Sequence, residues 1–255
     1  MKTVKGLHEK MGTFENANTS FHQAARCKRY TNEVLAFSMV KEEELLRATE
    51  EIQNLTYRQG EYKIFKVFEP KERLIMALPF YDRVVQHMIC NAIQPVFENG
   101  FYYHSYACRS GKGMHAASDT LYQWMYETEV KQGLRMYAFK GDISKYFASI
   151  PHDKLKDENR RYIGDKKALM LMDDIIDHNG ILPDGVGIPV GNLTSQLFAN
   201  VYGNKLDKFC KHVLHIPYFV RYMDDFIILS DDLEQLKEWV KRIEEFLENE
   251  MLLHI

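Results

Sequence analysis

The apolar residues near the end of the chain form two short runs separated by a pair of acidic residues. The runs, 219–222 and 226–229, are rich in the β-branched and aromatic residues that favour strands. We therefore expect a β-hairpin that carries Asp224 and Asp225 at its tip. Because neighbouring carboxylates repel each other unless a cation lies between them, the pair is a candidate metal site. The alternative is a plain hairpin turn, since aspartate tolerates turn conformations.

A second Met-Asp-Asp triplet, at 172–174, has a different pattern around it. The neighbouring apolar residues recur at helical spacing: Leu169, Met172, Ile175 and Ile176. Gly180 then supplies a helix stop. Asp173 and Asp174 are therefore predicted to lie on a solvated helix face and not in a metal site.

Two further strands are predicted at 62–68 and 73–78, on either side of a turn that contains proline. Lys66, Lys71 and Arg73 would lie on or near this hairpin. Such a basic hairpin can grip a triphosphate. Equally, lysine is common on edge strands because it prevents aggregation.

One more alternating stretch, 134–143, predicts a strand that ends on Asp142. Two Mg²⁺ ions about 3.5–4 Å apart would need a third carboxylate beside the Asp224–Asp225 pair, and Asp142 is the candidate. A glycine-bearing loop at 185–196 leads into a helix, and glycine there lets the backbone approach a ligand closely. A plain tight turn is the alternative for this loop.

The remaining apolar residues have helical spacing. Helices are predicted over 31–54, 82–93 and 115–130, from 152, through 197–206 and after 231. Pro95 is expected to limit the second of these, and Asp231 to cap the last. In the helix over 115–130, the residues expected to face inward are Leu121, Trp124 and Met125. The final residues, 252–255, have the composition of the opening of a strand.

Charge and cysteine content narrow the class of protein. The 255 residues include 33 basic and 36 acidic ones, so the basic excess typical of a nucleic-acid binder is missing. Four cysteines, without metal-ligand spacing, are expected to be reduced in an intracellular protein. No signal peptide and no apolar run of membrane-spanning length is present, so we expect a soluble protein without a membrane partner.

Six motifs, taken in order, resemble those of reverse transcriptases over nearly the whole chain. They are Lys71-Glu72-Arg73-Leu74-Ile75, Leu78-Pro79-Phe80-Tyr81-Asp82-Arg83-Val84-Val85-Gln86, Ser105-Tyr106-Ala107-Cys108-Arg109, Gly141-Asp142-Ile143, Gly191-Asn192-Leu193-Thr194-Ser195-Gln196 and Tyr222-Met223-Asp224-Asp225. The finger motifs and the stretch 190–196 are most similar to bacterial enzymes of the diversity-generating retroelement type. Group II intron reverse transcriptases are wider relatives.

This resemblance implies an α+β fold of the right-hand polymerase type, with fingers and an antiparallel palm sheet packed by helices. The expected division is an N-terminal helical extension at 1–60, fingers with the first palm helix at 61–134, and a palm at 135–255. A fingers insertion is expected near 156–185. The family continues into a lysine-bearing strand and a helical thumb, so we expect a truncated fingers-palm fragment, and its activity without a thumb is left open.

The same resemblance implies the roles of the acidic residues. Asp142, Asp224 and Asp225 would be catalytic and bind two Mg²⁺ ions, or Mn²⁺ in their place, with Ile143 lending only its backbone. Catalysis would be in-line attack of a primer 3′-hydroxyl on the α-phosphate of a nucleotide.

The implied nucleotide site contains Phe147, which would crowd a ribose 2′-hydroxyl, and Arg73, which with Lys66 or Lys71 would hold the triphosphate. The other members of that site are Gly191, against the nascent base pair, and Gln196. Residues implied to contact template or primer are Arg109, Tyr222 and Met223.

One departure concerns the residues on either side of Gly191. Many reverse transcriptases have Gln before this glycine and Ser-Pro after it, whereas Val190 and Ser195-Gln196 stand in those positions here. A side-chain amide near the incoming nucleotide is therefore missing, which predicts error-prone copying.

The expected function is that of a cytoplasmic, bacterial RNA-directed DNA polymerase. Its partners would be an RNA template, a DNA or RNA primer, dNTPs and an accessory protein of the retroelement. The alternatives are an RNA-dependent RNA polymerase or terminal transferase, which use the same acids, and a nucleic-acid-binding scaffold. Phe147 argues against ribonucleotide use, and three intact aspartates argue against a scaffold.

Overall fold

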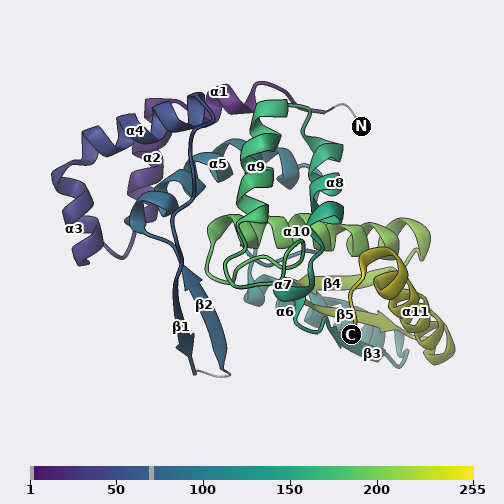
Figure 1. Cartoon of the computed structure of the whole chain (residues 1–255). Helices are drawn as coiled ribbons and strands as arrows, with labels where there is room; N and C mark the ends of the chain where they lie inside the picture. The colour runs from purple at the N-terminus through teal and green to yellow at the C-terminus, as the bar shows by residue number, and fades with distance from the viewer. Residues whose placement is uncertain (1–2, 69–71) are drawn as a thin grey trace. The chain divides into compact units, whose positions relative to one another are not determined.

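The computed structural model describes residues 3–68 and 72–255, and the chain divides into two units that are interleaved in sequence. The first unit consists of Met1–Gly100 and His152–Phe198, and the second of Phe101–Pro151 and Ala199–Ile255. Helices and small antiparallel sheets give the α+β class that was expected (Figure 1). The expected boundaries between the N-terminal extension, the fingers and the palm, at residues 60 and 134, stay predictions.

The first unit is mainly helical. Its helices are α1 (Leu7–Met11), α2 (Phe14–Ala24), α3 (Asn32–Met39), α4 (Lys41–Gln53), α5 (Phe80–Glu98), α8 (His152–Tyr162) and α9 (Lys166–Asp177). Asp165 caps α9 by accepting from the backbone N–H groups of Lys167 and Ala168, and it also accepts from Leu7 and His8 at the start of α1. Partial burial pushes the pKa of Asp165 up, but these four donors outweigh it and hold the pKa below its usual value. One carboxylate thus joins the starts of two helices.

Contrary to the sequence prediction, Pro95 does not end α5. The helix runs from Phe80 to Glu98 with Pro95 inside it. Ile93 and Phe97, on either side of the proline, are fully buried. Their packing outweighs the backbone hydrogen bond that proline removes, so tertiary contacts override local propensity here. None of the helices in the described ranges has both the length and the apolar character needed to cross a membrane.

Two features of the first unit, a strand pair and a helix, were predicted closely. The strands β1 (Lys63–Val67) and β2 (Arg73–Ala77) form the expected antiparallel pair, visible as an extended ribbon in Figure 1. The second Met-Asp-Asp triplet lies in α9, as expected. There Asp173 pairs with Arg160, and Asp174 is exposed. Helical spacing therefore separated this triplet correctly from the one in the hairpin.

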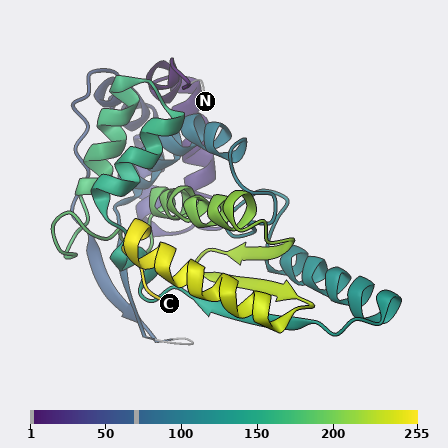
Figure 2. The same ribbon diagram turned by 90° about the vertical axis from the view of Figure 1, so that its right-hand side faces the viewer.

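The second unit is built on a three-stranded antiparallel sheet. Its strands are β3 (Tyr137–Asp142), β4 (Tyr218–Tyr222) and β5 (Asp225–Ser230), in the order β3-β5-β4. The helix α11 (Leu233–Phe246) packs on β3 and β5, and α6 (Met114–Met125) packs on β4 (Figure 2). A short helix, α7 (Tyr146–Ser149), follows β3. The helix α10 (Leu193–Lys208) begins in the first unit and continues into the second.

Three local predictions for the second unit were wrong. The cap of α11 is Asp232 and not Asp231, since the Asp232 side chain accepts from the N–H groups of Glu234 and Gln235. Met125 is exposed, because α6 buries fully only the side of the helix that carries Ala117. Residues 252–255 form no strand: the N–H of Leu253 bonds back to Leu247, and the carbonyl of His254 accepts from Ser144.

Gly141 leaves room for the Phe226 ring directly behind the end of β3. A Cβ at Gly141 would lie 2.3 Å from Phe226 Cζ, and Phe226 is 1% exposed. We expect Gly141→Ala to lower the free energy of unfolding by about 1–3 kcal/mol, because an added methyl overpacks the core. Thermal unfolding should show this as a fall in Tm. Adding Phe226→Leu should restore part of the loss, and an unchanged Tm in Gly141→Ala would contradict the steric explanation.

Candidate active site

Backbone pairing brings together the three aspartates that the sequence singled out. Asp142, the last residue of β3, lies opposite Asp225, the first residue of β5. Beside this pair, the N–H of Ile143 donates a hydrogen bond to the carbonyl of Asp224 at 3.1 Å. Directly opposed residues of antiparallel strands project on the same face, so the carboxylates of Asp142 and Asp225 share one side of the sheet.

A lysine lies beside these carboxylates. Lys140 Nζ is 3.1 Å from Asp225 Oδ1. The pKa of Lys140 is raised, first by that hydrogen bond and then by the charge of Asp225, with smaller contributions from Asp142 and Asp224. The three acids therefore create a local field that attracts a cation.

The donor set fits a divalent ion, although the side chains are not arranged around one. Among the described residues, no three His, Cys, Asp or Glu side chains are grouped as a metal site. Carboxylate oxygens are the ligands that Mg²⁺ prefers, and the exposed ammonium of Lys140 occupies the position of a counter-ion. Asp142, Asp224 and Asp225 are the residues that would hold the ion.

The turn that carries Asp224 has an unusual backbone. Met223 has φ of 60°, a left-handed conformation that costs a residue other than glycine about 1–3 kcal/mol. Two-residue hairpin loops need such angles, and glycine usually supplies them. Met223 is only 7% exposed, which leaves little of its side chain for contact with a nucleic acid. Tyr222, by contrast, is exposed at the end of β4, and its contact with a primer stays a prediction.

Phe147 lies on α7, shortly after Asp142. Its neighbour Tyr146 is buried and donates its hydroxyl proton to the carbonyl of Ala199 at 2.7 Å. Phe147 itself is half-buried, and its ring meets the Tyr146 ring edge-on. Tyr146 therefore anchors the helix in the core, and part of the Phe147 ring remains available for contact.

The glycine loop of the first unit is joined to β2. The N–H of Met76 donates to the carbonyl of Val190 at 3.0 Å. Gly191 has φ of 122°, and a Cβ there would lie 3.0 Å from the Met76 carbonyl oxygen. The close approach therefore requires glycine. Gln196 is exposed on the first turn of α10.

Two buried or half-buried side chains hold the start of α10 in place. The Asn192 amide donates to the Tyr62 hydroxyl at 2.8 Å, and Gln86 Oε1 accepts from the N–H of Leu193 at 3.1 Å. Gln86 lies within one of the predicted motifs, but nothing in the sequence indicated its partner 107 positions away.

The predicted triphosphate ligands lie on the β1–β2 ribbon. The register pairs Lys66 with Leu74 and Val67 with Arg73, so the Lys66 and Arg73 side chains leave opposite faces of the ribbon. Lys66 pairs with Glu72 at 2.6 Å, and Arg73 is exposed. Lys71 lies outside the described residues.

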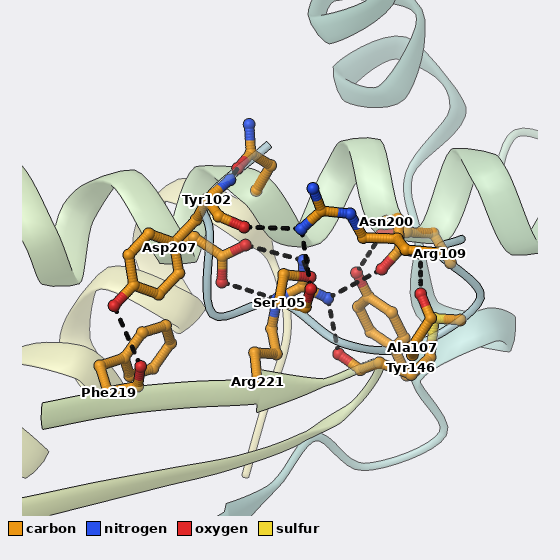
Figure 3. Close-up of polar contacts among 12 residues, drawn as sticks. Tyr102, Ser105, Ala107, Arg109, Tyr146, Asn200, Asp207, Phe219 and Arg221 are labelled. Carbon is orange, nitrogen blue, oxygen red and sulfur yellow. Dashed lines mark hydrogen bonds and ion pairs between the residues drawn. The ribbon is translucent and has the colours of Figure 1, made fainter. Parts of the chain in front are cut away.

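Arg109 supports its own loop in this structure. Its Nη1 donates to the carbonyl oxygens of Tyr102 and Ser105, at 2.7 and 2.8 Å (Figure 3). Its predicted contact with template or triphosphate stays a prediction.

The sequence reading missed the buried ion pair of Arg221 and Asp207. Both side chains are completely buried, and Arg221 Nε lies 2.6 Å from Asp207 Oδ1. A signal was present, since Arg221 interrupts an otherwise apolar and aromatic strand. Its partner on α10 was not recognisable without the fold.

These features agree with a family assignment made by sequence comparison. The family model described as reverse transcriptase (RNA-dependent DNA polymerase) matches residues 66–253, which is more than half of the chain. The chain therefore belongs to the reverse transcriptase family, whose activity is RNA-directed nucleotidyl transfer.

Two relatives match the chain over about half its length. It is 28% identical to protein YkfC of Escherichia coli (strain K12) over 134 residues, which is 50% of this chain and 34% of that protein. It is 29% identical to an uncharacterised 91 kDa protein in the cob intron of Schizosaccharomyces pombe (strain 972 / ATCC 24843) over 137 residues, 52% of this chain and 16% of that protein. The chain thus spans well under half the length of either relative.

Solved structures share the fold at low sequence identity. A chain of a partial Cas6-RT-Cas1–Cas2 complex matches with a TM-score of 0.55 and 18% identity, covering 96% of this chain and 43% of that one. Telomerase from Candida tropicalis, truncated from its C-terminal domain, matches with a TM-score of 0.54 and 14% identity, covering 76% and 48%. The expectation that the chain has a reverse transcriptase fold over most of its length is confirmed.

Proposed function

We propose that this chain is the fingers and palm of a bacterial retroelement reverse transcriptase that extends a primer on an RNA template with dNTPs. The observation that carries the proposal is the pairing of Asp142 with Asp225, together with the Ile143–Asp224 backbone bond beside it. That pairing places three acids at one end of a sheet in a chain of the reverse transcriptase family.

In this proposal the second unit is the palm. Asp142, Asp224 and Asp225 hold the divalent ions, and the Ile143 backbone contributes next to them. When bound, two such ions activate the primer hydroxyl and stabilise the charge on the leaving pyrophosphate. Tyr222 contacts the primer end, because its exposed ring lies on the same sheet face as Asp225. The exposed Lys140 ammonium would have to leave Asp225 for an ion to be held there.

The first unit supplies the fingers. Arg73 neutralises the triphosphate, and Gly191 and Gln196 face the incoming nucleotide. The rigid attachment of Gly191 to β2 supports this role, since a backbone that approaches a base pair has to be held without a side chain. Val190, in the position where many family members have Gln, makes copying error-prone.

The similarity of the finger motifs and of residues 190–196 supports a retroelement of the diversity-generating type. The similarity to the S. pombe protein in the cob intron supports a retroelement origin in the broader sense. In the solved Cas6-RT-Cas1–Cas2 complex the reverse transcriptase is assembled with other proteins. By analogy, an accessory protein of the retroelement is the proposed partner here, beside the template, the primer and dNTPs in the bacterial cytoplasm.

Primer extension tests this function. The purified protein should extend a labelled primer on a defined RNA template with dNTPs and Mg²⁺. Parallel reactions with NTPs, and with primer alone, distinguish an RNA polymerase and a terminal transferase. Binding of the primer-template without extension in any of these reactions would overturn the proposal in favour of a scaffold.

A further inference from the structure

Arg221 is the largest fully buried charged side chain in the second unit, and every nitrogen of its guanidinium is engaged. Nε and Nη2 donate to the two carboxylate oxygens of Asp207 at 2.6 and 2.8 Å, and Nη2 also donates to Ser105 Oγ at 3.1 Å (Figure 3). Nη1 donates to the carbonyl of Met223 at 2.9 Å and lies 3.4 Å from Asn200 Oδ1. One planar group therefore connects α10, the 101–109 loop and the hairpin turn.

Stability alone is a poor reason for such a pair. Burial raises the pKa of the Asp207 carboxyl, and the Arg221 guanidinium opposes that rise, so each charge depends on the other. Burying two charges costs desolvation that their attraction recovers only with good geometry, and apolar residues of similar size often serve the core as well. The pair is better explained by what it holds in place.

What it holds is the backbone of the hairpin turn. Met223 is the left-handed residue of that turn, and its carbonyl leads directly into Asp224. A strained turn keeps one conformation only when its surroundings fix it. The Nη1 bond fixes the inner side of the turn, and the bond from Ile143 N–H to the Asp224 carbonyl fixes the next peptide.

Gly203 on α10 provides the space for this arrangement. A Cβ at Gly203 would lie 2.6 Å from Arg221 Nη1 and 2.7 Å from Cζ. Glycine in the middle of a helix is otherwise unfavourable. Glycine at this position leaves space for Arg221 Nη1, the nitrogen that donates to the Met223 carbonyl.

We propose that Arg221, seated against Gly203 and paired with Asp207, is a positioning residue that locks the Met223–Asp224 turn and so sets where the Asp224 and Asp225 carboxylates point. We call the bonds of Arg221 to Asp207 and to the Met223 carbonyl the clamp. The catalytic consequence of the clamp rests on the proposed function, but the clamp itself does not. Arg221 acts through the backbone and touches neither substrate nor metal.

Two variants break the clamp in different ways. Arg221→Lys keeps a positive charge near Asp207 but loses the planar fork that reaches Asp207 and Met223 together. Gly203→Ala keeps every polar group but places a methyl group 2.6 Å from Arg221 Nη1 and 2.9 Å from the Tyr146 hydroxyl, and it does not depend on how a lysine packs. Ser105→Ala is the matched control, because it removes one bond of the same guanidinium from the other terminal nitrogen.

Three measurements at matched folded fraction decide the matter. In both variants the Ile143 amide should lose protection in hydrogen exchange, while amides near Tyr137 and Ser230, at the far end of the same strand pair, keep theirs. Mn²⁺ affinity, measured by electron paramagnetic resonance without nucleic acid, should fall about tenfold, as it does when an outer partner of a metal ligand is lost. In primer extension, kcat should fall about tenfold with KM for dNTP unchanged. Ser105→Ala should resemble the wild type in all three.

The outcomes separate the clamp from the proposed function. Folded Arg221→Lys and Gly203→Ala proteins with normal Ile143 protection and normal Mn²⁺ affinity would overturn the inference. An equal loss in Ser105→Ala would also overturn it, since the effect would then be general loosening of the core. If the wild type failed to extend any primer, the proposed function would fail, and the exchange and Mn²⁺ comparisons would still decide the role of Arg221.

Discussion

Asp224→Asn is expected to lower primer extension by about three orders of magnitude while primer-template binding stays close to that of the wild type. The substitution preserves shape and removes the charge that would hold a divalent ion. A carboxylate that serves the transition state contributes little to holding the duplex, so kcat should fall and Kd should not. Single-turnover extension and a binding titration on the same preparation measure the two quantities.

The chain contains a matched control for this experiment. Asp174 belongs to the second Met-Asp-Asp triplet, on α9, where it is exposed and lies 3.7 Å from Arg58. Asp174→Asn makes the same chemical change within the other Met-Asp-Asp triplet and should leave extension unaltered. A parallel fall of binding and turnover in Asp224→Asn would refute the assigned role, because it would indicate loss of the fold or of the nucleic-acid surface.

Phe147→Ala is expected to raise incorporation of ribonucleotides relative to deoxyribonucleotides by about one to two orders of magnitude. The half-buried ring would lie under the sugar and exclude a 2′-hydroxyl by contact alone, and truncation removes the obstacle. This change corresponds to roughly 1.4–2.8 kcal/mol of differential transition-state binding. Incorporation of matched dNTP and NTP pairs, at equal folded fraction, gives the ratio directly, and use of dNTPs should fall less.

Phe139→Ala separates this effect from a loss of packing. Phe139 is also half-buried, but it lies on the face of β3 opposite to that of Asp142 and contacts Phe226. Its truncation should reduce stability and leave the sugar ratio unchanged. An unchanged ratio in Phe147→Ala would remove the steric gate and leave the three aspartates unaffected.

The sequence predicted those parts of the fold that depend on local periodicity. Alternation identified the strands around residues 63–77, 137–142 and 218–230, and helical spacing assigned the second Met-Asp-Asp triplet correctly. The need for a third acid also led from the hairpin to Asp142, because the chemistry requires that residue type at a strand end. The strand and helix inferences succeeded because each used information within about ten residues, whereas the role of Asp142 stays a prediction.

Features that depend on distant contacts were not predictable in this way. Pro95 continues a helix because Ile93 and Phe97 are buried by other elements. Arg221 finds Asp207 fourteen positions away on a different element, and only the fold shows that Gly203 makes space for it. The one-residue error at the cap of α11 has a simpler cause, since Asp231 and Asp232 are chemically identical and only backbone geometry selects between them.

The interleaving of the two units sets the order in which the site can assemble during synthesis. β5 is the central strand of its sheet, yet it leaves the ribosome more than eighty residues after Asp142. Until then β3 has no partner, and the first unit, completed at Phe198, can fold ahead of it. The long loop closure makes this pairing a slow step. A nascent chain released before Asp225 would therefore carry an unpaired strand edge prone to aggregation and no assembled set of acids.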